Sequence, residues 1–373
     1  MKIGILTYWW GSDNYGQLLQ CYALQKYLRD LGHDVFFIRY NYNTEKKKNS
    51  FSFWKKAVMA MNPVIFYNHF ERKFSRKKVL EINKSRNFDE FRNKYISFSE
   101  NIFFRYNDLR NTPPRADAYI VGSDQVWNFT FTNNVKPVVH SYMLDFGEKN
   151  VKRFSYAASW GVSVISDELK REIAPLLKNF DYVSVREQQG IDLCKQCGYD
   201  GAEWVCDPTL LLSADSYRML YSENKIRKPD KKYILLYMLA NKYDFDLNAV
   251  YRFAKKKTLD VVFVTGNYMA GKREKFYATI PEWLYLVDNA EYVISNSFHC
   301  AIFSILFNKQ FGVVRLVGLH EGMNSRLDSL FDLYGISARY LRTDDFSVLD
   351  RRYIPVKKEI QNHFLEKLLY SDT

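Results

Sequence analysis

The chain contains few cysteines, five among its 373 residues. This low and odd number argues against a disulfide framework. Cys194 and Cys197 form a CxxC motif, but only Cys206 lies nearby, and no neighbouring histidine completes the four ligands of a structural zinc site. We therefore expect the cysteines to be buried thiols.

Long apolar runs are also absent from the sequence. The longest, residues 233–240 and 301–307, are much shorter than the roughly 18–20 residues of a membrane-spanning helix. Residues 1–8 lack the small-residue cleavage site of a signal peptide and are typical of a first strand. We expect a cytoplasmic protein.

The common signatures of nucleotide and metal sites are missing as well. The sequence has no GxGxxG, P-loop, HExxH or GxSxG motif. Asp344 and Asp345 form an acidic pair, but they lie in a late loop rather than at the end of a strand. The sequence therefore predicts neither a bound metal nor a cofactor.

Charge, in contrast, is abundant and uneven. The 54 basic and 42 acidic residues give a net charge of +12, which suits nucleic acid, an anionic membrane surface or an anionic substrate. No nucleic-acid-binding module is visible, so we expect no nucleic-acid partner. Much of the excess lies in residues 45–115, where basic clusters alternate with aromatic residues. This stretch is either a solvated helical excursion or, in residues 51–78, a contact with an anionic membrane.

The order of apolar segments predicts an α/β fold. Residues 2–8, 15–31 and 34–40 read as strand, helix and parallel strand, and the pattern resumes at residues 233–239. Hydrophobic residues make up 47% of the chain, enough for two cores. We predict two Rossmann-like domains facing across a cleft. The predicted parts are an N-terminal domain at 1–215 with the excursion at about 45–115, a C-terminal domain at 230–355, and a helix at 356–373 that packs back on the N-terminal domain.

Polar residues follow several predicted strands, and parallel α/β sheets bind ligands at the carboxyl ends of their strands. These residues are therefore candidates for the site: Asn14, Tyr15, Gly16, Ser123, Asp124, Gln125, Ser159, Arg186, Asn296, Ser297 and His299.

Four features of these residues, together with Arg326 at the start of a later helix, indicate possible roles in binding and catalysis. The helix that begins near Gly16 favours an anion at its N-terminus, and Arg186 with Arg326 would form an anion clamp. Asp124 would orient or deprotonate a hydroxyl, and His299 is the candidate acid and base, because imidazole exchanges protons near neutral pH. Structural alternatives remain open: helix caps for Asn14 and Asp124, an ion pair with Glu187 or another acid for Arg186, a surface position for Arg326, and a satisfied histidine at 299.

The ordered motifs resemble the polysaccharide pyruvyl transferase family. They are Asn14-Tyr15-Gly16, residues 122–128 (GSDQVWN), residues 156–159 (YAAS), Ser184-Val185-Arg186-Glu187, residues 207–211 (DPTLL) and Asn296-Ser297-Phe298-His299. The resemblance implies a GT-B-like fold and phosphoenolpyruvate as donor. The acceptor would be a hydroxyl pair of a glycan sugar, and the product a cyclic pyruvate ketal.

One departure from the family pattern concerns anion binding. Many members carry Arg-x-His where this chain has Ser297-Phe298-His299, so Arg186, Arg326 or a lysine must take over. The implied acceptor is a lipid-linked or polymeric glycan of a bacterial capsule or exopolysaccharide, with the enzyme peripheral at the inner face of the plasma membrane. Two further hypotheses are a GT-B glycosyltransferase that uses a nucleotide-sugar and a non-catalytic binding protein for an anionic glycan.

Overall fold

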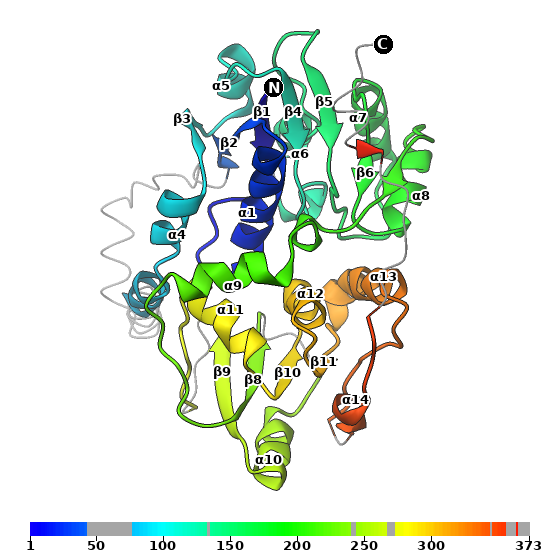
Figure 1. The fold of residues 1–373 in the computed structure, drawn as a ribbon. Helices are drawn as coiled ribbons and strands as arrows, with labels where there is room; N and C mark the ends of the chain where they lie inside the picture. Colours follow the sequence, from blue (N-terminus) through cyan, green and yellow to red (C-terminus); the bar gives the residue numbers. More distant parts are fainter. Residues whose placement is uncertain are drawn as a thin grey trace, which may run out of the picture.

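The computed structural model describes residues 1–42, 77–132, 135–239, 244–266, 273–343, 345–355 and 363–364. Its strands form two main parallel sheets, one above the other in Figure 1, with helices packed on their faces. The predicted α/β fold with two Rossmann-like domains is confirmed.

The first sheet has the strand order β3-β2-β1-β4-β5. Its strands are β1 (Lys2–Leu6), β2 (Asp34–Tyr40), β3 (Phe98–Phe103), β4 (Ala118–Val121) and β5 (Lys152–Ser155). A short parallel pair, β6 (Ser184–Val185) and β7 (Glu203–Trp204), continues it through bridges from Phe154 to Tyr182 and from Ala158 to Val185. All these strands end at one edge of the domain, as parallel strands must.

The second sheet has the order β11-β10-β8-β9. Its strands are β8 (Tyr233–Met238), β9 (Asp260–Thr265), β10 (Tyr292–Ser295) and β11 (Phe311–Val313). Every residue of β8 is buried, which explains why its sequence is apolar throughout rather than alternating.

Helices connect the strands and cover both sheets. In the first domain they are α1 (Tyr15–Asp30), α4 (Phe88–Tyr95), α5 (Tyr106–Asn111), η2 (Phe129–Phe131), α6 (Val135–Tyr142), α7 (Asp167–Leu177), α8 (Gln189–Gln196) and η3 (Pro208–Leu210). From the domain junction onward they are α9 (Ala214–Ser222), α10 (Leu247–Lys257), α11 (Ile280–Asp288), α12 (Phe298–Leu306), η4 (Gly318–Asn324), α13 (Ser325–Leu333) and α14 (Ser347–Asp350).

The predicted helical excursion at about 45–115 is wrong in part. Residues 98–103 form the edge strand β3, which pairs in parallel with β2. The strand is hard to read from the sequence because its middle, Ser-Glu-Asn, is polar and mostly exposed. Its pairing is reinforced by Ser99, whose hydroxyl accepts a hydrogen bond from the backbone N–H of Arg39 at 3.1 Å. Residues 43–76, with most of the predicted membrane-contact stretch, lie outside the described residues.

The predicted C-terminal helix at 356–373 also lies outside the described residues, apart from His363 and Phe364. Nδ1 of His363 lies 2.6 Å from Oε1 of Glu203, and Phe364 is fully buried with its ring centroid 4.7 Å from that of Tyr156. Both partners belong to the first domain, so these two residues of the predicted helix contact that domain.

The two domains share a continuous aromatic core. Tyr15, at the start of α1, stacks on Trp283 of α11 with ring centroids 5.2 Å apart and an interplanar angle of 7°. The Tyr15 hydroxyl donates a hydrogen bond to the carbonyl of Ala278 at 2.8 Å. In Figure 1, α9, α11 and α12 lie between the two sheets. The junction is therefore tightly packed on this side, and it fixes α1 and α12 relative to each other.

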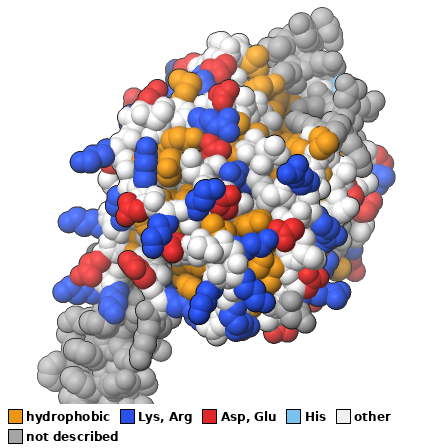
Figure 2. All heavy atoms as spheres, turned by 60° about the horizontal axis from the view of Figure 1, so that its bottom comes forward, with side chains coloured by type: hydrophobic (Ala, Val, Ile, Leu, Met, Phe, Trp, Pro, Cys, Tyr) orange, Lys and Arg blue, Asp and Glu red, His pale blue; other side chains and the backbone are white. Residues whose placement is uncertain are grey.

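On the face shown in Figure 2, basic side chains are spread out, with acidic and hydrophobic side chains among them. Within the ranges given above, no helix is both long and apolar enough to cross a membrane.

Candidate functional site

The candidate site lies where strand ends of the first domain meet the first turn of α12. Ser123 and Asp124 follow β4, Arg186 follows β6, and Asp207 follows β7 as the N-cap of η3. His299 comes from the second domain, in α12 just after β10. Neighbouring strands thus bring these side chains together although they are far apart in the sequence.

Asp207 is the centre of this cluster. Its Oδ2 accepts hydrogen bonds from the Ser123 hydroxyl and from Nη1 of Arg186, both at 2.9 Å. Its Oδ1 accepts from the backbone N–H of Thr209 at 3.0 Å and from the Thr209 hydroxyl at 2.6 Å. The Asp207 side chain is fully buried, so the carboxylate is held by protein groups alone.

The charge of Asp207 follows from these neighbours. Burial would raise the pKa of a carboxyl group, but the neighbouring His299 and Arg186 and the hydrogen bond from Thr209 lower it more. The pKa of Asp207 therefore lies well below its usual range, and the group is ionised at neutral pH. Nε2 of His299 lies 3.5 Å from Oδ2 of Asp207, which is an ion-pair distance but not a hydrogen bond.

Arg186 is almost as buried as its partner, with a side chain 1% exposed. Its Cζ lies 4.7 Å from the ring centroid of Phe298, and that of Arg326 lies 5.5 Å from the same centroid. Nε and Nη2 of Arg186 have no hydrogen-bond partner within the described part of the chain. Burial, then repulsion by Arg186, lowers the pKa of Arg326 to about 10, so it remains a cation at neutral pH.

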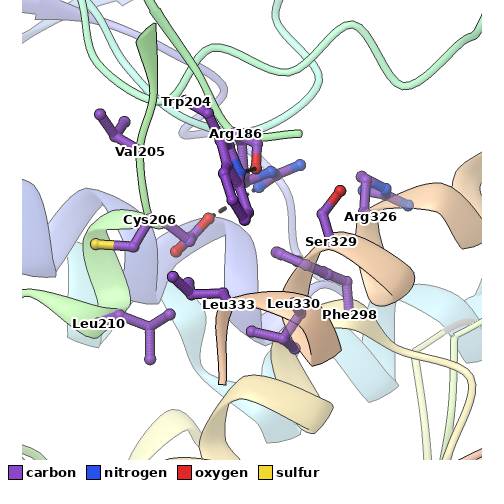
Figure 3. A pocket seen from close by; sticks show the side chains of 11 residues that line it. Arg186, Trp204, Val205, Cys206, Leu210, Phe298, Arg326, Ser329, Leu330 and Leu333 are labelled. Carbon is purple, nitrogen blue, oxygen red and sulfur yellow. Dashed lines mark hydrogen bonds and ion pairs between the residues drawn. The ribbon is translucent and has the colours of Figure 1, made fainter. Parts of the chain in front are cut away.

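These two arginines line a small pocket between the two domains. Figure 3 shows Arg186 entering it from the first domain and Arg326 from α13, with Ser329 between them and Phe298 below. The remaining wall is mostly apolar. The pocket offers guanidinium groups held in fixed positions, which is the arrangement that binds phosphate or carboxylate groups.

His299 is buried against the first turn of α1. A Cβ atom placed on Gly16 would lie 2.2 Å from both Cγ and Nδ1 of His299, so only glycine leaves room for the imidazole. Ser297 caps α12, its hydroxyl accepting from the backbone N–H of Cys300 at 3.3 Å. The close approach of α1 and α12 therefore places the imidazole beside Asp207.

Asp124 lies next to this cluster in a strained backbone conformation with φ of 79°. Its Oδ1 accepts from the backbone N–H of Gln125 at 2.9 Å, and its Oδ2 lies 3.4 Å from Nε2 of Gln17 in α1. Its backbone carbonyl accepts from the N–H of Ser159 at 3.0 Å. The strain fixes the carboxylate at the end of β4 rather than in a regular helix cap.

The other predicted residues occupy supporting positions around the cluster. The hydroxyl of Ser159 donates to Glu187 at 3.0 Å, and the side-chain oxygen of Gln125 accepts from Asn128 at 3.0 Å. Asn14 is the N-cap residue of α1 without a side-chain cap bond, and Tyr15 is buried in the domain junction. Asn296 accepts from the backbone N–H of Leu239 at 2.8 Å.

Two acidic residues of the site, Asp207 and Glu187, were not among the predicted site residues. Arg186 pairs with Asp207 rather than with Glu187, whose Oε1 accepts from the backbone N–H groups of Trp160 and Gly161. The signal for Asp207 was present in the DPTLL segment, because an acid before proline after a strand is a frequent start of a helical turn. Among the residues described, no group of three or more His, Cys, Asp or Glu side chains is placed to hold a metal ion.

Comparisons with solved structures give matches along most of the chain at low identity. UDP-GlcNAc 2-epimerase from Neisseria meningitidis bound to UDP-GlcNAc is 9% identical, with 94% of this chain and 89% of that chain covered and a TM-score of 0.46. The Methanocaldococcus jannaschii enzyme in complex with UDP-GlcNAc and UDP is 11% identical, with 92% and 97% covered and a TM-score of 0.45. The glycosyltransferase SsfS6 from Streptomyces sp. SF2575 is 10% identical, with 94% and 93% covered and a TM-score of 0.32.

A search of curated proteins gives no significant match. The model of the family described as polysaccharide pyruvyl transferase matches residues 14–315, which is most of the chain.

Proposed function

The chain belongs to the polysaccharide pyruvyl transferase family, and we propose that it transfers pyruvate from phosphoenolpyruvate to two hydroxyls of a glycan sugar, forming a cyclic ketal. The observation that carries this proposal is the buried cationic pocket. Arg186 and Arg326 approach the same ring of Phe298, and Arg186 keeps two N–H-bearing nitrogens without a partner within the described residues. Phosphoenolpyruvate carries a phosphate and a carboxylate, the two groups that arginine forks bind.

The proposed reaction needs one proton on carbon and two hydroxyls that lose theirs. A proton added to the methylene carbon of the donor turns it into a methyl group and leaves C2 electron-poor. The first sugar oxygen bonds to C2 and the C2–O bond to phosphate breaks. The second sugar oxygen then closes the ketal. Of the two hydroxyl protons, one balances the proton taken up by carbon and the other leaves with phosphate.

We assign the proton transfers to His299 and the orientation of the acceptor hydroxyl to Asp124. The imidazole of His299 lies beside Asp207, an ionised carboxylate that also lines the pocket. Asp124 follows the same strand as Ser123, which donates to Asp207. The proposed proton donor and the proposed hydroxyl-orienting group therefore both lie next to residues bound to Asp207 or to Asp207 itself. Asn14, Gly16 and the other polar strand-end residues remain proposed substrate contacts.

A thermal-shift panel tests the donor. The full-length protein is heated with phosphoenolpyruvate, pyruvate, phosphate or a nucleotide-sugar. A ligand at about 100 times its dissociation constant adds about 2.7 kcal/mol of stability, which raises Tm by a few degrees. We expect a shift with phosphoenolpyruvate that is lost in Arg326→Met and kept in Arg252→Met, a matched surface arginine. A shift with a nucleotide-sugar alone would replace pyruvyl transfer with glycosyl transfer.

The proposal extends to the acceptor and the cellular location. We propose a lipid-linked or polymeric glycan of a capsule or exopolysaccharide as acceptor, with residues 51–78 holding the enzyme at an anionic membrane surface. Sedimentation with anionic liposomes at low salt tests the location. If the full-length protein stays in the supernatant, the membrane proposal is wrong while the donor assignment stands.

A further inference from the structure

A cluster of aromatic side chains lies beside Asp124, on the side away from the cationic pocket. The strand order β3-β2-β1-β4-β5, continued by β6 and β7, explains this placement. Residues after β2 and β1 lie on one side of the β4 loop, and the residues of the cationic pocket that follow β6 and β7 lie on the other. The loop that carries Asp124 is therefore in the middle of the carboxyl edge.

The cluster consists of Tyr8 and Trp10 after β1, Tyr42 after β2, and Tyr142 at the end of α6. The ring centroids of Tyr8 and Trp10 are 5.2 Å apart, and those of Trp10 and Tyr42 are 5.8 Å apart at an interplanar angle of 88°. Trp10 and Tyr42 are partly exposed, whereas Tyr8 is buried and Tyr142 fully so. The rings thus form a rigid wall with a buried back and a partly open front.

A hydrogen bond links this wall to Asp124. The backbone N–H of Gly11, next to Trp10, donates to Oε1 of Gln17 at 2.7 Å. Nε2 of the same glutamine lies 3.4 Å from Oδ2 of Asp124. The position of Trp10 is therefore coupled to the carboxylate that we assign to the acceptor hydroxyl.

The wall also contains a hydroxyl group without a hydrogen-bond partner among the described residues. The hydroxyl of Tyr142 is buried and has no hydrogen-bond partner anywhere in the described part of the chain. Burial raises the pKa of Tyr142 well above its ordinary value, and neighbouring groups that include Tyr8 and Asp124 raise it further. The hydroxyl is therefore a neutral donor and acceptor, and leaving it unpaired is costly.

A pyranose ring fits these features. Its face of C–H bonds packs on the electron-rich face of an aromatic ring, and its hydroxyls need polar partners. We propose that Trp10 and Tyr42, backed by the buried rings of Tyr8 and Tyr142, form the subsite that holds a pyranose ring of the acceptor glycan next to Asp124. This inference rests on the proposed function, because it places the acceptor on the aromatic side of Asp124 and the donor on the cationic side.

Saturation-transfer NMR on the full-length protein tests the subsite with methyl glycosides of glucose, galactose and mannose as probes. We expect transfer to at least one of them from the wild type. Trp10→Ala should abolish it, and Trp10→Phe should restore part of it by returning an aromatic face. Tyr142→Phe should not lower the stability, because it removes a buried hydroxyl that has no partner among the described residues.

Trp9→Phe is the matched control. Trp9 belongs to the same loop, and its ring contacts that of Trp10 edge-on at 6.2 Å, but it also packs against Phe98 and the core on the other face of the sheet. Its Nε1 donates to the carbonyl of Tyr40, and phenylalanine keeps an aromatic ring in this place. We expect this variant to bind the probes like the wild type. Absence of transfer to all three probes in the wild type, or equal transfer in the wild type and Trp10→Ala, would overturn the subsite.

The donor assignment is measured separately. A shift of Tm by phosphoenolpyruvate should be the same in Trp10→Ala and in the wild type, because the cationic pocket lies on the other side of Asp124. Probe binding without any effect of phosphoenolpyruvate would support the sugar subsite and count against pyruvyl transfer.

Discussion

Replacing Asp207 by asparagine removes one charge from a buried ion pair. The side chains of Asp207 and Arg186 are 0% and 1% exposed, and their atoms Oδ2 and Nη1 are 2.9 Å apart. Breaking a buried pair by removing one partner costs about 3–5 kcal/mol, because the remaining charge is left uncompensated. Asparagine keeps the shape of the side chain and one acceptor oxygen. We therefore expect the free energy of unfolding to fall by the lower end of this range, about 3 kcal/mol. At roughly 2–4 °C per kcal/mol, Tm should fall by about 6–12 °C.

A double-mutant cycle separates the charge effect from general damage. The variants are Asp207→Asn, Arg186→Met and the combination, compared by urea and thermal unfolding under fixed conditions. Residues in one buried network couple by about 0.5–3 kcal/mol, so the double variant should lose clearly less stability than the sum of the two single losses. Asp167→Asn is the control, since that carboxylate is 87% exposed and its contact with Lys170 is screened by water.

Two outcomes would refute this reasoning. A Tm of Asp207→Asn equal to that of the wild type would mean that no buried charge had lost its partner. Losses that add up within error would mean that the two side chains do not interact energetically. Either result would also remove the ionised carboxylate that we place beside His299.

Three further predictions follow from the same geometry. His299→Ala should lower phosphate release with donor and acceptor by roughly 10²–10⁴-fold while circular dichroism stays unchanged, and full activity would exclude His299 from proton transfer. Gly16→Ala should reduce both activity and Tm despite the better helix propensity of alanine, because the new Cβ would lie 2.2 Å from the imidazole of His299. Gly322→Ala is the control and should leave both unchanged, because a Cβ there would have no other atom within 4 Å. The pKa of Asp207 is lower in the folded protein than in the unfolded chain. The ionised carboxylate therefore stabilises the folded state fully above the unfolded pKa of about 3.9, and this stabilisation is lost progressively as the pH falls below that value toward the folded pKa. Acid should therefore lower the Tm of the wild type more than the Tm of Asp207→Asn.

The sequence predicts the strands well where both faces of the sheet are buried. Strands such as β8 are covered on both faces, and their continuous apolar runs end at polar residues. β3 was missed because an edge strand is stabilised by backbone pairing and needs few apolar residues. Propensity carries little information at such a position.

Within the candidate site, the sequence predicts mainly those residues that directly follow a strand. Ser123, Arg186 and His299 were found because each follows a strand, and parallel strands end at one edge. The DPTLL segment indicates the start of a helical turn at Asp207, but not its role, because its contacts with Arg186 and His299 join residues far apart in the sequence. Gly16 illustrates the same limit. The sequence suggested an anion at a helix N-terminus, whereas the structure adds that the missing Cβ makes room for His299.

The charges around the pocket suggest why an ionised aspartate belongs in an anion site. Arg186 and Arg326 lie near each other, and their repulsion together with burial already lowers the pKa of Arg326. Asp207 offsets one of these charges, so the guanidinium groups can remain ionised and buried before any ligand arrives. The same carboxylate lies 3.5 Å from Nε2 of His299. In the proposed chemistry Asp207 would therefore serve both halves, because it holds Arg186 in place and lies beside the imidazole to which we assign the proton transfers.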